Sequence, residues 1–82
     1  MVGVKFTKEF RLTFSKIKDE MMKAKIRKQI QKIKENSEVG KPMGYSKKGT
    51  RELYIRPFRL SYSYIKTEDT VYILDLYHKD EQ

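Results

Sequence analysis

Apolar and polar residues alternate at the start of the chain, with Val2, Val4 and Phe6 separated by Gly3 and a lysine. Alternate residues of a strand point to opposite faces, so this pattern predicts a short strand with one buried side. Three further strand-like runs fill the second half of the chain, at residues 51–56, 58–66 and 71–77. Turn residues separate these runs, which predicts three consecutive antiparallel strands.

Between the first strand and residue 40, apolar residues recur at spacings of three and four, the period of one helix face. They form two series, Phe10, Phe14, Ile17 and Met21, then Met22, Ile26, Ile30 and Ile33. Thr7 stands where a helix N-cap is expected, and Asp19 is a credible N-cap between the two series. One long helix and two helices both fit, and Asp19 favours two, the second ending near Asn36.

These elements predict an α+β fold in the order β-α-α-β-β-β. We expect an N-terminal strand, a helical hairpin and a three-stranded antiparallel meander, with the helices packed on one face of the sheet. Residues 1–82 are expected to form a single domain, because the sequence contains no repeat, low-complexity tract or linker. Residues 41–49 predict a loop, and its Lys47 and Lys48 suit either a phosphate-facing segment or a solvated connection.

The charge of the chain favours an anionic partner. Its 82 residues carry a formal net charge of +8, and clustered Lys and Arg gain binding free energy mainly by releasing counterions. The absence of cysteine and the single histidine exclude disulfides, thiolate metal sites and multi-histidine sites, so no metal or cofactor is expected. No window holds the roughly 20 apolar residues of a membrane span, and we expect a soluble cytoplasmic protein without membrane contact.

Strand parity sorts the side chains of the last three strands onto two faces. The side chains expected to face the helices are Leu53, Ile55, Leu60, Tyr62, Tyr64, Leu74 and Leu76. The opposite face then receives Glu52, Tyr54, Arg59, Ser61, Ser63, Asp75 and Tyr77. On this face Arg59 either meets an anion or pairs with Asp75 across the strands.

The arginines of the predicted hairpin and the only histidine complete the set of candidates. Arg51 and Arg56 flank the first strand of the hairpin, which indicates that an anion lies against the sheet. His78 follows the last strand beside Lys79 and, on this prediction, across from Arg59. It is either a surface residue or a group that gives a proton to a leaving oxygen or binds a phosphate.

Three segments together resemble the RelE/ParE toxin superfamily. They are Gly40-Lys-Pro-Met, Phe58-Arg-Leu-Ser-Tyr62 and Ile73-Leu-Asp-Leu-Tyr-His-Lys-Asp-Glu81. The family typically has a Gly-Lys-Pro-Leu segment, a Tyr-Arg-Leu-Ile-Tyr strand and a last strand ending in Gly-His-Arg-Asp-Glu, in the same order. The resemblance covers essentially the whole chain and implies the toxin of a type II toxin–antitoxin pair.

The RelE branch of that family cleaves messenger RNA in the ribosomal decoding site. The family reaction is metal-free: the ribose 2′-hydroxyl attacks the adjacent phosphate and expels the 5′-oxygen. The resemblance therefore implies three partners, namely the ribosome, messenger RNA and an acidic RelB-like antitoxin, with any contact to DNA made only through the antitoxin. The ParE branch inhibits DNA gyrase without cleaving RNA, and a non-catalytic basic RNA- or ribosome-binding module is a further alternative.

Carried over residue by residue, the resemblance makes Arg59 the phosphate clamp. Lys79 becomes a second phosphate contact and His78 a candidate general acid. The chain departs from RelE nucleases by placing Glu52 and Tyr54 where they often have basic residues, and by having no tyrosine after Glu81. Glu52 is then either a carboxylate base or a partner that holds Arg59.

The remaining candidates are contacts to RNA. A tyrosine can stack on a base, and three are available for this, Tyr45, Tyr54 and Tyr77. The cations expected along the RNA are Arg51, Arg56, Lys47 and Lys48.

Overall fold

The computed structural model describes residues 2–42 and 49–78. Its elements are β1 (Gly3–Phe6), α1 (Lys8–Lys16), α2 (Glu20–Glu35), β2 (Lys41–Pro42), β3 (Thr50–Ile55), β4 (Phe58–Ile65), a 3₁₀ turn (Lys66–Glu68) and β5 (Thr70–His78). Within these residues, five strands form one sheet in the order β1-β5-β4-β3-β2. β1 runs parallel to β5, and the other neighbours are antiparallel.

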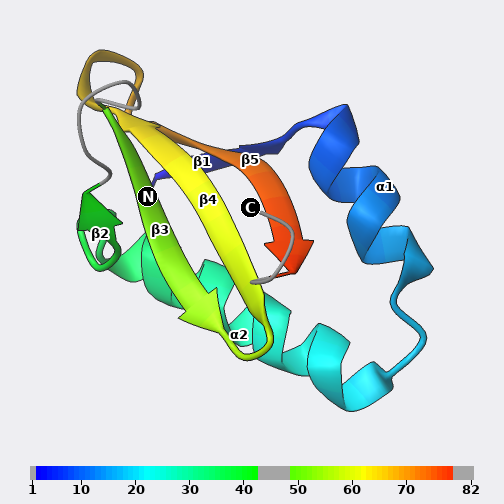
Figure 1. Cartoon of the computed structure of the whole chain (residues 1–82). Helices are drawn as coiled ribbons and strands as arrows, with labels where there is room; N and C mark the ends of the chain where they lie inside the picture. Colours follow the sequence, from blue (N-terminus) through cyan, green and yellow to red (C-terminus); the bar gives the residue numbers. More distant parts are fainter. Residues whose placement is uncertain (1, 43–48, 79–82) are drawn as a thin grey trace.

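The predicted α+β fold is confirmed, with two additions from the structure. In Figure 1, α2 crosses behind the sheet and α1 lies beside β1 and β5, so no described helix covers the other face of the sheet, which is here called the open face. The short strand β2 lies in a segment that the sequence predicted to be loop, and β1 joins the sheet in parallel. In the described part of the chain, no helix has the length and apolar character needed to cross a membrane.

Side-chain caps divide the helical region into two helices. The Thr7 hydroxyl accepts a hydrogen bond from the amide of Phe10 at 3.1 Å. The Asp19 carboxylate accepts one from the amide of Met21 at 2.9 Å, which satisfies a donor that the first turn of α2 leaves free. The single apolar face drawn through Ile17 and Met21 is therefore wrong: Ile17 is the C-cap that follows α1, and Met21, in the first turn of α2, is 75% exposed.

The core lies between the helices and the covered face of the sheet. Its buried side chains are Phe10, Ile26, Ile33, Ile55, Leu60, Tyr62, Val71, Ile73 and Leu76. They come from both helices and from β3, β4 and β5, so burial of apolar area ties all these elements together.

A β-bulge shifts the parity of β5 relative to the sequence prediction. Ser61 pairs with Asp75 but the next residue, Tyr62, pairs with Ile73, so Leu74 is the extra residue of β5. The prediction that Leu74 faces the helices is therefore wrong, and the fully buried Ile73 takes that place. Strict alternation cannot reveal one inserted residue, because both residues are apolar.

The segment after α2 is fixed against the sheet by Tyr62 and Arg51. The buried Tyr62 hydroxyl accepts a hydrogen bond from the Gly40 amide at 2.8 Å and donates one to the Ser37 carbonyl at 3.0 Å. Arg51 donates to the carbonyls of Glu38 and Gly40 at 3.1 and 2.8 Å. A Cβ on Gly40 would lie 2.8 Å from the Tyr62 ring, so only glycine fits this close approach. These contacts set the start of β2.

We expect Tyr62→Phe to lower the free energy of unfolding by about 1–3 kcal/mol, because it leaves the buried Gly40 amide without its acceptor. Urea denaturation at neutral pH measures this effect. The matched control is Tyr64→Phe. The native Tyr64 hydroxyl donates a hydrogen bond to Asp69 at the surface, so its removal should change the free energy of unfolding little. Equal effects of the two substitutions would contradict the role given to Tyr62.

Candidate active site

Polar side chains of three strands meet on the open face of the sheet, which is turned toward the viewer in Figure 1. The strand register aligns them in two rows, one of Tyr54, Arg59 and Tyr77, the other of Glu52, Ser61 and Asp75. Residues that share a row across antiparallel strands point to the same face. The structure thus brings together four of the predicted site residues, which lie up to 25 positions apart in the sequence: Glu52, Tyr54, Arg59 and Tyr77.

Glu52 stands between Arg59 and Tyr77 and binds both. One carboxylate oxygen, Oε1, accepts a hydrogen bond from Arg59 Nη1 at 3.0 Å. The other, Oε2, accepts one from the Tyr77 hydroxyl. The side chains of Glu52 and Arg59 are 16% and 30% exposed, so the pair is accessible to a ligand from solvent. Among the described residues, Arg59 forms an ion pair with Glu52, whereas the Asp75 carboxylate accepts a hydrogen bond from the Leu76 amide.

Tyr77 is a proton donor to Glu52 at neutral pH. Burial, followed by the hydrogen bond to Glu52, raises the pKa of Tyr77 to about 12. A phenol with that pKa stays protonated near pH 7 and cannot serve there as a general base. Its hydroxyl instead fixes the orientation of the carboxylate.

The raised pKa of Tyr77 predicts a specific loss of stability in alkali. Because the folded pKa of about 12 lies above the usual value of 10.0, the contribution of Tyr77 is complete below about pH 10 and disappears as the pH rises toward 12. We expect the stability difference between the native chain and Tyr77→Phe to narrow over this range. Urea denaturation of both proteins at about pH 8, 10 and 11 measures this difference in the free energy of unfolding. A difference that stays constant over this range would contradict the assignment.

Tyr54 offers an exposed aromatic surface beside the ion pair. Its side chain is 49% exposed. The guanidinium carbons of Arg56 and Arg59 lie 6.0 and 5.9 Å from the centre of its ring, within the range of cation–π attraction. An exposed aromatic ring with two cations close to it is suited to a nucleic-acid base with its flanking phosphates.

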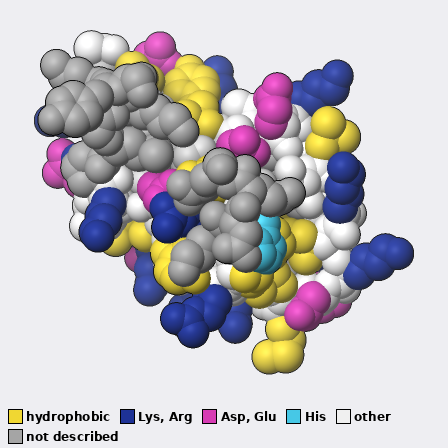
Figure 2. All heavy atoms as spheres, in the orientation of Figure 1, with side chains coloured by type: hydrophobic (Ala, Val, Ile, Leu, Met, Phe, Trp, Pro, Cys, Tyr) yellow, Lys and Arg dark blue, Asp and Glu magenta, His cyan; other side chains and the backbone are white. Residues whose placement is uncertain are grey.

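A hollow of about 500 Å³ opens beside these residues and adds one residue that the sequence prediction missed. Its lining consists of Val39, Lys41, Glu52, Leu53, Tyr54 and Arg59. Lys41 reaches it because β2 pairs Lys41 with Glu52 across the edge of the sheet. A two-residue strand has no periodicity to detect, and the only available signal was the Gly-Lys-Pro segment. Figure 2 shows Lys and Arg side chains around much of the rim of this face.

Other predicted site residues lie elsewhere or outside the described residues. Arg51 pairs with the buried Tyr62, and its guanidinium binds the carbonyls after α2 rather than the open face. His78 pairs with Phe58 instead of Arg59, and their rings meet edge to face at 5.9 Å. The expectation that His78 lies across from Arg59 is therefore wrong. Outside the described residues lie Tyr45, Lys47, Lys48 and Lys79.

Comparison with known proteins places this fold among the toxins of type II toxin–antitoxin systems. The isolated RelE toxin of E. coli superposes with a TM-score of 0.82 at 15% identity, covering 100% of this chain and 88% of that chain. The YoeB/ParE toxin of Agrobacterium tumefaciens gives 0.84 at 15%, covering 94% and 98%. The RelBE2 toxin–antitoxin complex of Mycobacterium tuberculosis gives 0.80 at 26%, covering 94% and 96%.

The sequence itself identifies the family. Residues 4–82 match the family described as the ParE toxin of the type II toxin–antitoxin system parDE. The chain therefore belongs to the ParE toxin family, within the RelE/YoeB/ParE superfamily that its sequence resembles. No curated protein matches the sequence.

Proposed function

We propose that this toxin is a ribosome-dependent endonuclease that cleaves messenger RNA by attack of a ribose 2′-hydroxyl on the adjacent phosphate. The observation that carries the proposal is the contact between Arg59 and Glu52 on the open face of the sheet. A cation suited to phosphate and a carboxylate suited to a hydroxyl proton lie side by side there. The reaction needs both groups.

Arg59 binds the scissile phosphate in this proposal. Its planar guanidinium donates two parallel hydrogen bonds to the non-bridging oxygens, an arrangement that a lysine cannot reproduce. The incoming phosphate replaces Glu52 at Arg59 Nη1 and thereby releases Glu52 Oε1. As the 2′-oxygen bonds to phosphorus, Arg59 stabilises the negative charge that develops on the phosphate oxygens.

Glu52 takes the proton of the attacking 2′-hydroxyl. The Tyr77 hydroxyl holds Oε2, so the freed Oε1 is the oxygen that accepts it. The bond between phosphorus and the 5′-oxygen then breaks, which leaves a 2′,3′-cyclic phosphate and a 5′-hydroxyl that has gained a proton. The family resemblance made His78 the candidate general acid for that last proton, and this assignment stays a prediction.

The ring of Tyr54 and the ammonium group of Lys41 bind the RNA beside the reacting phosphate. The exposed ring stacks on a neighbouring base, and Lys41, on the edge strand of the same hollow, contacts a further phosphate. Arg56 lies beside Tyr54 and adds a second cation to this side.

An acidic antitoxin is the protein partner that we propose. The solved relatives include the RelBE complex of E. coli and a heterotetrameric YoeB–YefM complex of Staphylococcus aureus, both described as toxin–antitoxin complexes. A chain with a net charge of +8 attracts an acidic partner over long range.

Inhibition of DNA gyrase is the second candidate function. Membership of the ParE toxin family favours it. The two functions differ in what is damaged in cells after induced expression. Cut transcripts with intact DNA support the nuclease, whereas DNA damage with intact transcripts would select the gyrase inhibitor.

A further inference from the structure

The proposed reaction needs a group that gives a proton to the leaving 5′-oxygen, and the predicted donor, His78, lies on the covered face of the sheet. His78 pairs with Phe58, which packs against the core, and the two rings meet edge to face. Residues paired across antiparallel strands point to the same face, so His78 lies on the side of the helices. Glu52 and Arg59 lie on the open face. The open face is therefore the place to look for a second donor.

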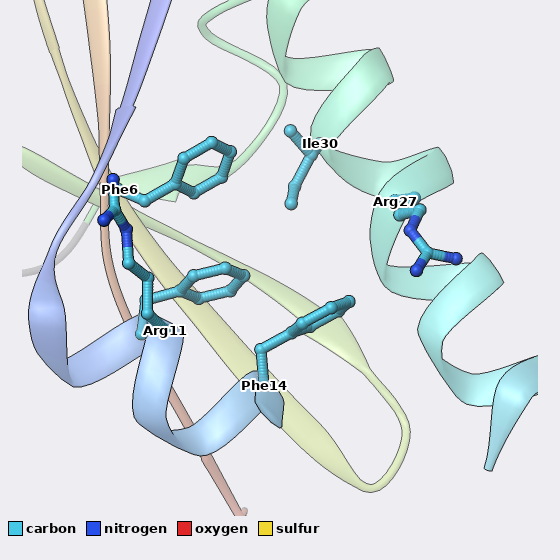
Figure 3. A pocket seen from close by; sticks show the side chains of 6 residues that line it. Phe6, Arg11, Phe14, Arg27 and Ile30 are labelled. Carbon is cyan, nitrogen blue, oxygen red and sulfur yellow. The ribbon is translucent and has the colours of Figure 1, made fainter. Parts of the chain in front are cut away.

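The hollow on the open face differs in its chemistry from the hollow between the two helices. Aromatic rings and Ile30 line the latter, and its cations are Arg11 and Arg27 (Figure 3). A guanidinium does not give up its proton in proteins, and none of the described residues that line this hollow is acidic. The hollow on the open face instead has both the carboxylate of Glu52 and the ammonium group of Lys41 in its lining. This second hollow is therefore suited to acid–base chemistry.

Lys41 is held at the edge of the sheet by the contacts of its neighbour, Gly40. The Gly40 amide donates a hydrogen bond to the buried Tyr62 hydroxyl at 2.8 Å, and the Gly40 carbonyl accepts one from Arg51 at 2.8 Å. The strand register then sets Lys41 opposite Glu52, with its side chain on the open face. The backbone of Lys41 is thus fixed, and its exposed side chain lines the hollow.

The carboxylate that Lys41 faces across the strands does not engage its ammonium group. Glu52 Oε1 accepts a hydrogen bond from Arg59 Nη1 and Oε2 accepts one from the Tyr77 hydroxyl, so the carboxylate is turned toward β4 and β5. Among the described residues, Lys41 forms no ion pair. The strands that carry Lys41 and Arg59 flank β3 on its two sides, two strand spacings or about 10 Å apart. A phosphate bound between the two side chains is contacted from both sides.

We propose that Lys41 is the general acid of the cleavage reaction and that its ammonium group gives a proton to the leaving 5′-oxygen. The inference rests on the proposed nuclease function and adds a catalytic residue to it. The attacking and leaving oxygens lie roughly in line on either side of the phosphorus. Because Glu52 Oε1 is turned toward β4, the leaving oxygen points toward β2, where Lys41 lies. An ammonium group has three N–H donors, so Lys41 can contact a further phosphate at the same time.

The proton transfers balance over one cleavage event. As the bond between phosphorus and the 5′-oxygen breaks, its electron pair stays on that oxygen, which takes a proton from Lys41 Nζ. Glu52 has by then gained the proton of the 2′-hydroxyl. Lys41 is left as a neutral amine and Glu52 as a neutral acid. Transfer of one proton from Glu52 to Lys41, directly or through water, restores both groups for the next cleavage.

The test compares two messenger RNAs on programmed ribosomes, one natural and one with sulfur in place of the 5′-oxygen at the bond that the native chain cleaves. A thiol has a pKa of about 8.5 and leaves as a thiolate, so its departure needs no acid. We expect Lys41→Ala to cleave the natural RNA at least about 100-fold more slowly than the native chain does. It should cleave the sulfur RNA as fast as the native chain, whereas Arg59→Ala should stay slow on both.

Two further variants separate proton donation from charge. Lys41→Arg keeps the positive charge but cannot give up a proton, so it should be slow on the natural RNA and recover on the sulfur RNA. Lys28→Ala removes the same charge from an exposed position of α2 and should cleave both RNAs as the native chain does.

Four results would overturn the proposal and leave the nuclease in place. They are native rates on the natural RNA with Lys41→Ala, native rates there with Lys41→Arg, slow cleavage of the sulfur RNA by both of these variants, and rescue by sulfur of His78→Ala in their place. A native chain that cleaves neither RNA would remove the proposed function itself, so the two failures are told apart by the native chain alone.

Discussion

Arg59→Ala is expected to lower the rate of messenger-RNA cleavage by about 100- to 1000-fold, the loss typical when one donor to a developing oxyanion is deleted. Growth arrest after induced expression should disappear with it. The fold should persist, because the Arg59 side chain is 30% exposed and its ion pair lies at the surface of the sheet, where such pairs contribute little to stability. Growth curves together with thermal unfolding of the purified variant measure both effects.

Two further substitutions separate the geometry of Arg59 from its charge. Arg59→Lys keeps the charge but loses the planar pair of donors, and should recover only a small part of the activity. Lys28→Ala removes one positive charge from an exposed position of α2 and should leave the activity as it is. A folded Arg59→Ala that still arrests growth would place the active site elsewhere.

Glu52→Gln is expected to lower the cleavage rate by about 100- to 10,000-fold, the range for loss of a positioned general base. An amide of the same shape cannot take the 2′-hydroxyl proton, although its oxygen can still accept a hydrogen bond from Tyr77. RNA affinity at fixed salt should hold or rise, since Arg59 loses its competing internal anion.

Single-turnover cleavage and an RNA-binding titration on the same preparation of Glu52→Gln measure the two effects separately. A rate unchanged by the substitution would mean that Glu52 only holds Arg59 in place. That outcome would leave the phosphate clamp intact and remove the base from the mechanism.

Much of the fold could be predicted because its signals are local. The caps at Thr7 and Asp19 are short-range hydrogen bonds between a polar side chain and nearby amides, and the residue types alone point to them. The alternation in β3 and β4 likewise placed Glu52, Tyr54 and Arg59 on one face. These three residues form the centre of the candidate site.

The errors in the sheet arise where pairing between distant strands decides the outcome. The bulge opposite Ser61 makes Leu74 an extra residue, and the register that follows sets Tyr77 rather than His78 against Arg59. Neither the bulge nor the register can be derived from the sequence of β5 alone, because register is a property of two strands. Lys41 was missed for the same reason, since its place beside Glu52 depends on the contacts that Tyr62 makes with the segment before β2.

In the proposed mechanism, the Arg59 and Glu52 pair cuts messenger RNA on the ribosome. The most direct test is primer extension on a reporter messenger RNA in a translating extract, with the native chain, Arg59→Ala and a reaction lacking ribosomes. We expect 5′ ends at discrete positions with the native chain, and no such ends with the variant or without ribosomes. Intact reporter in the presence of well-folded native protein and active ribosomes would contradict it.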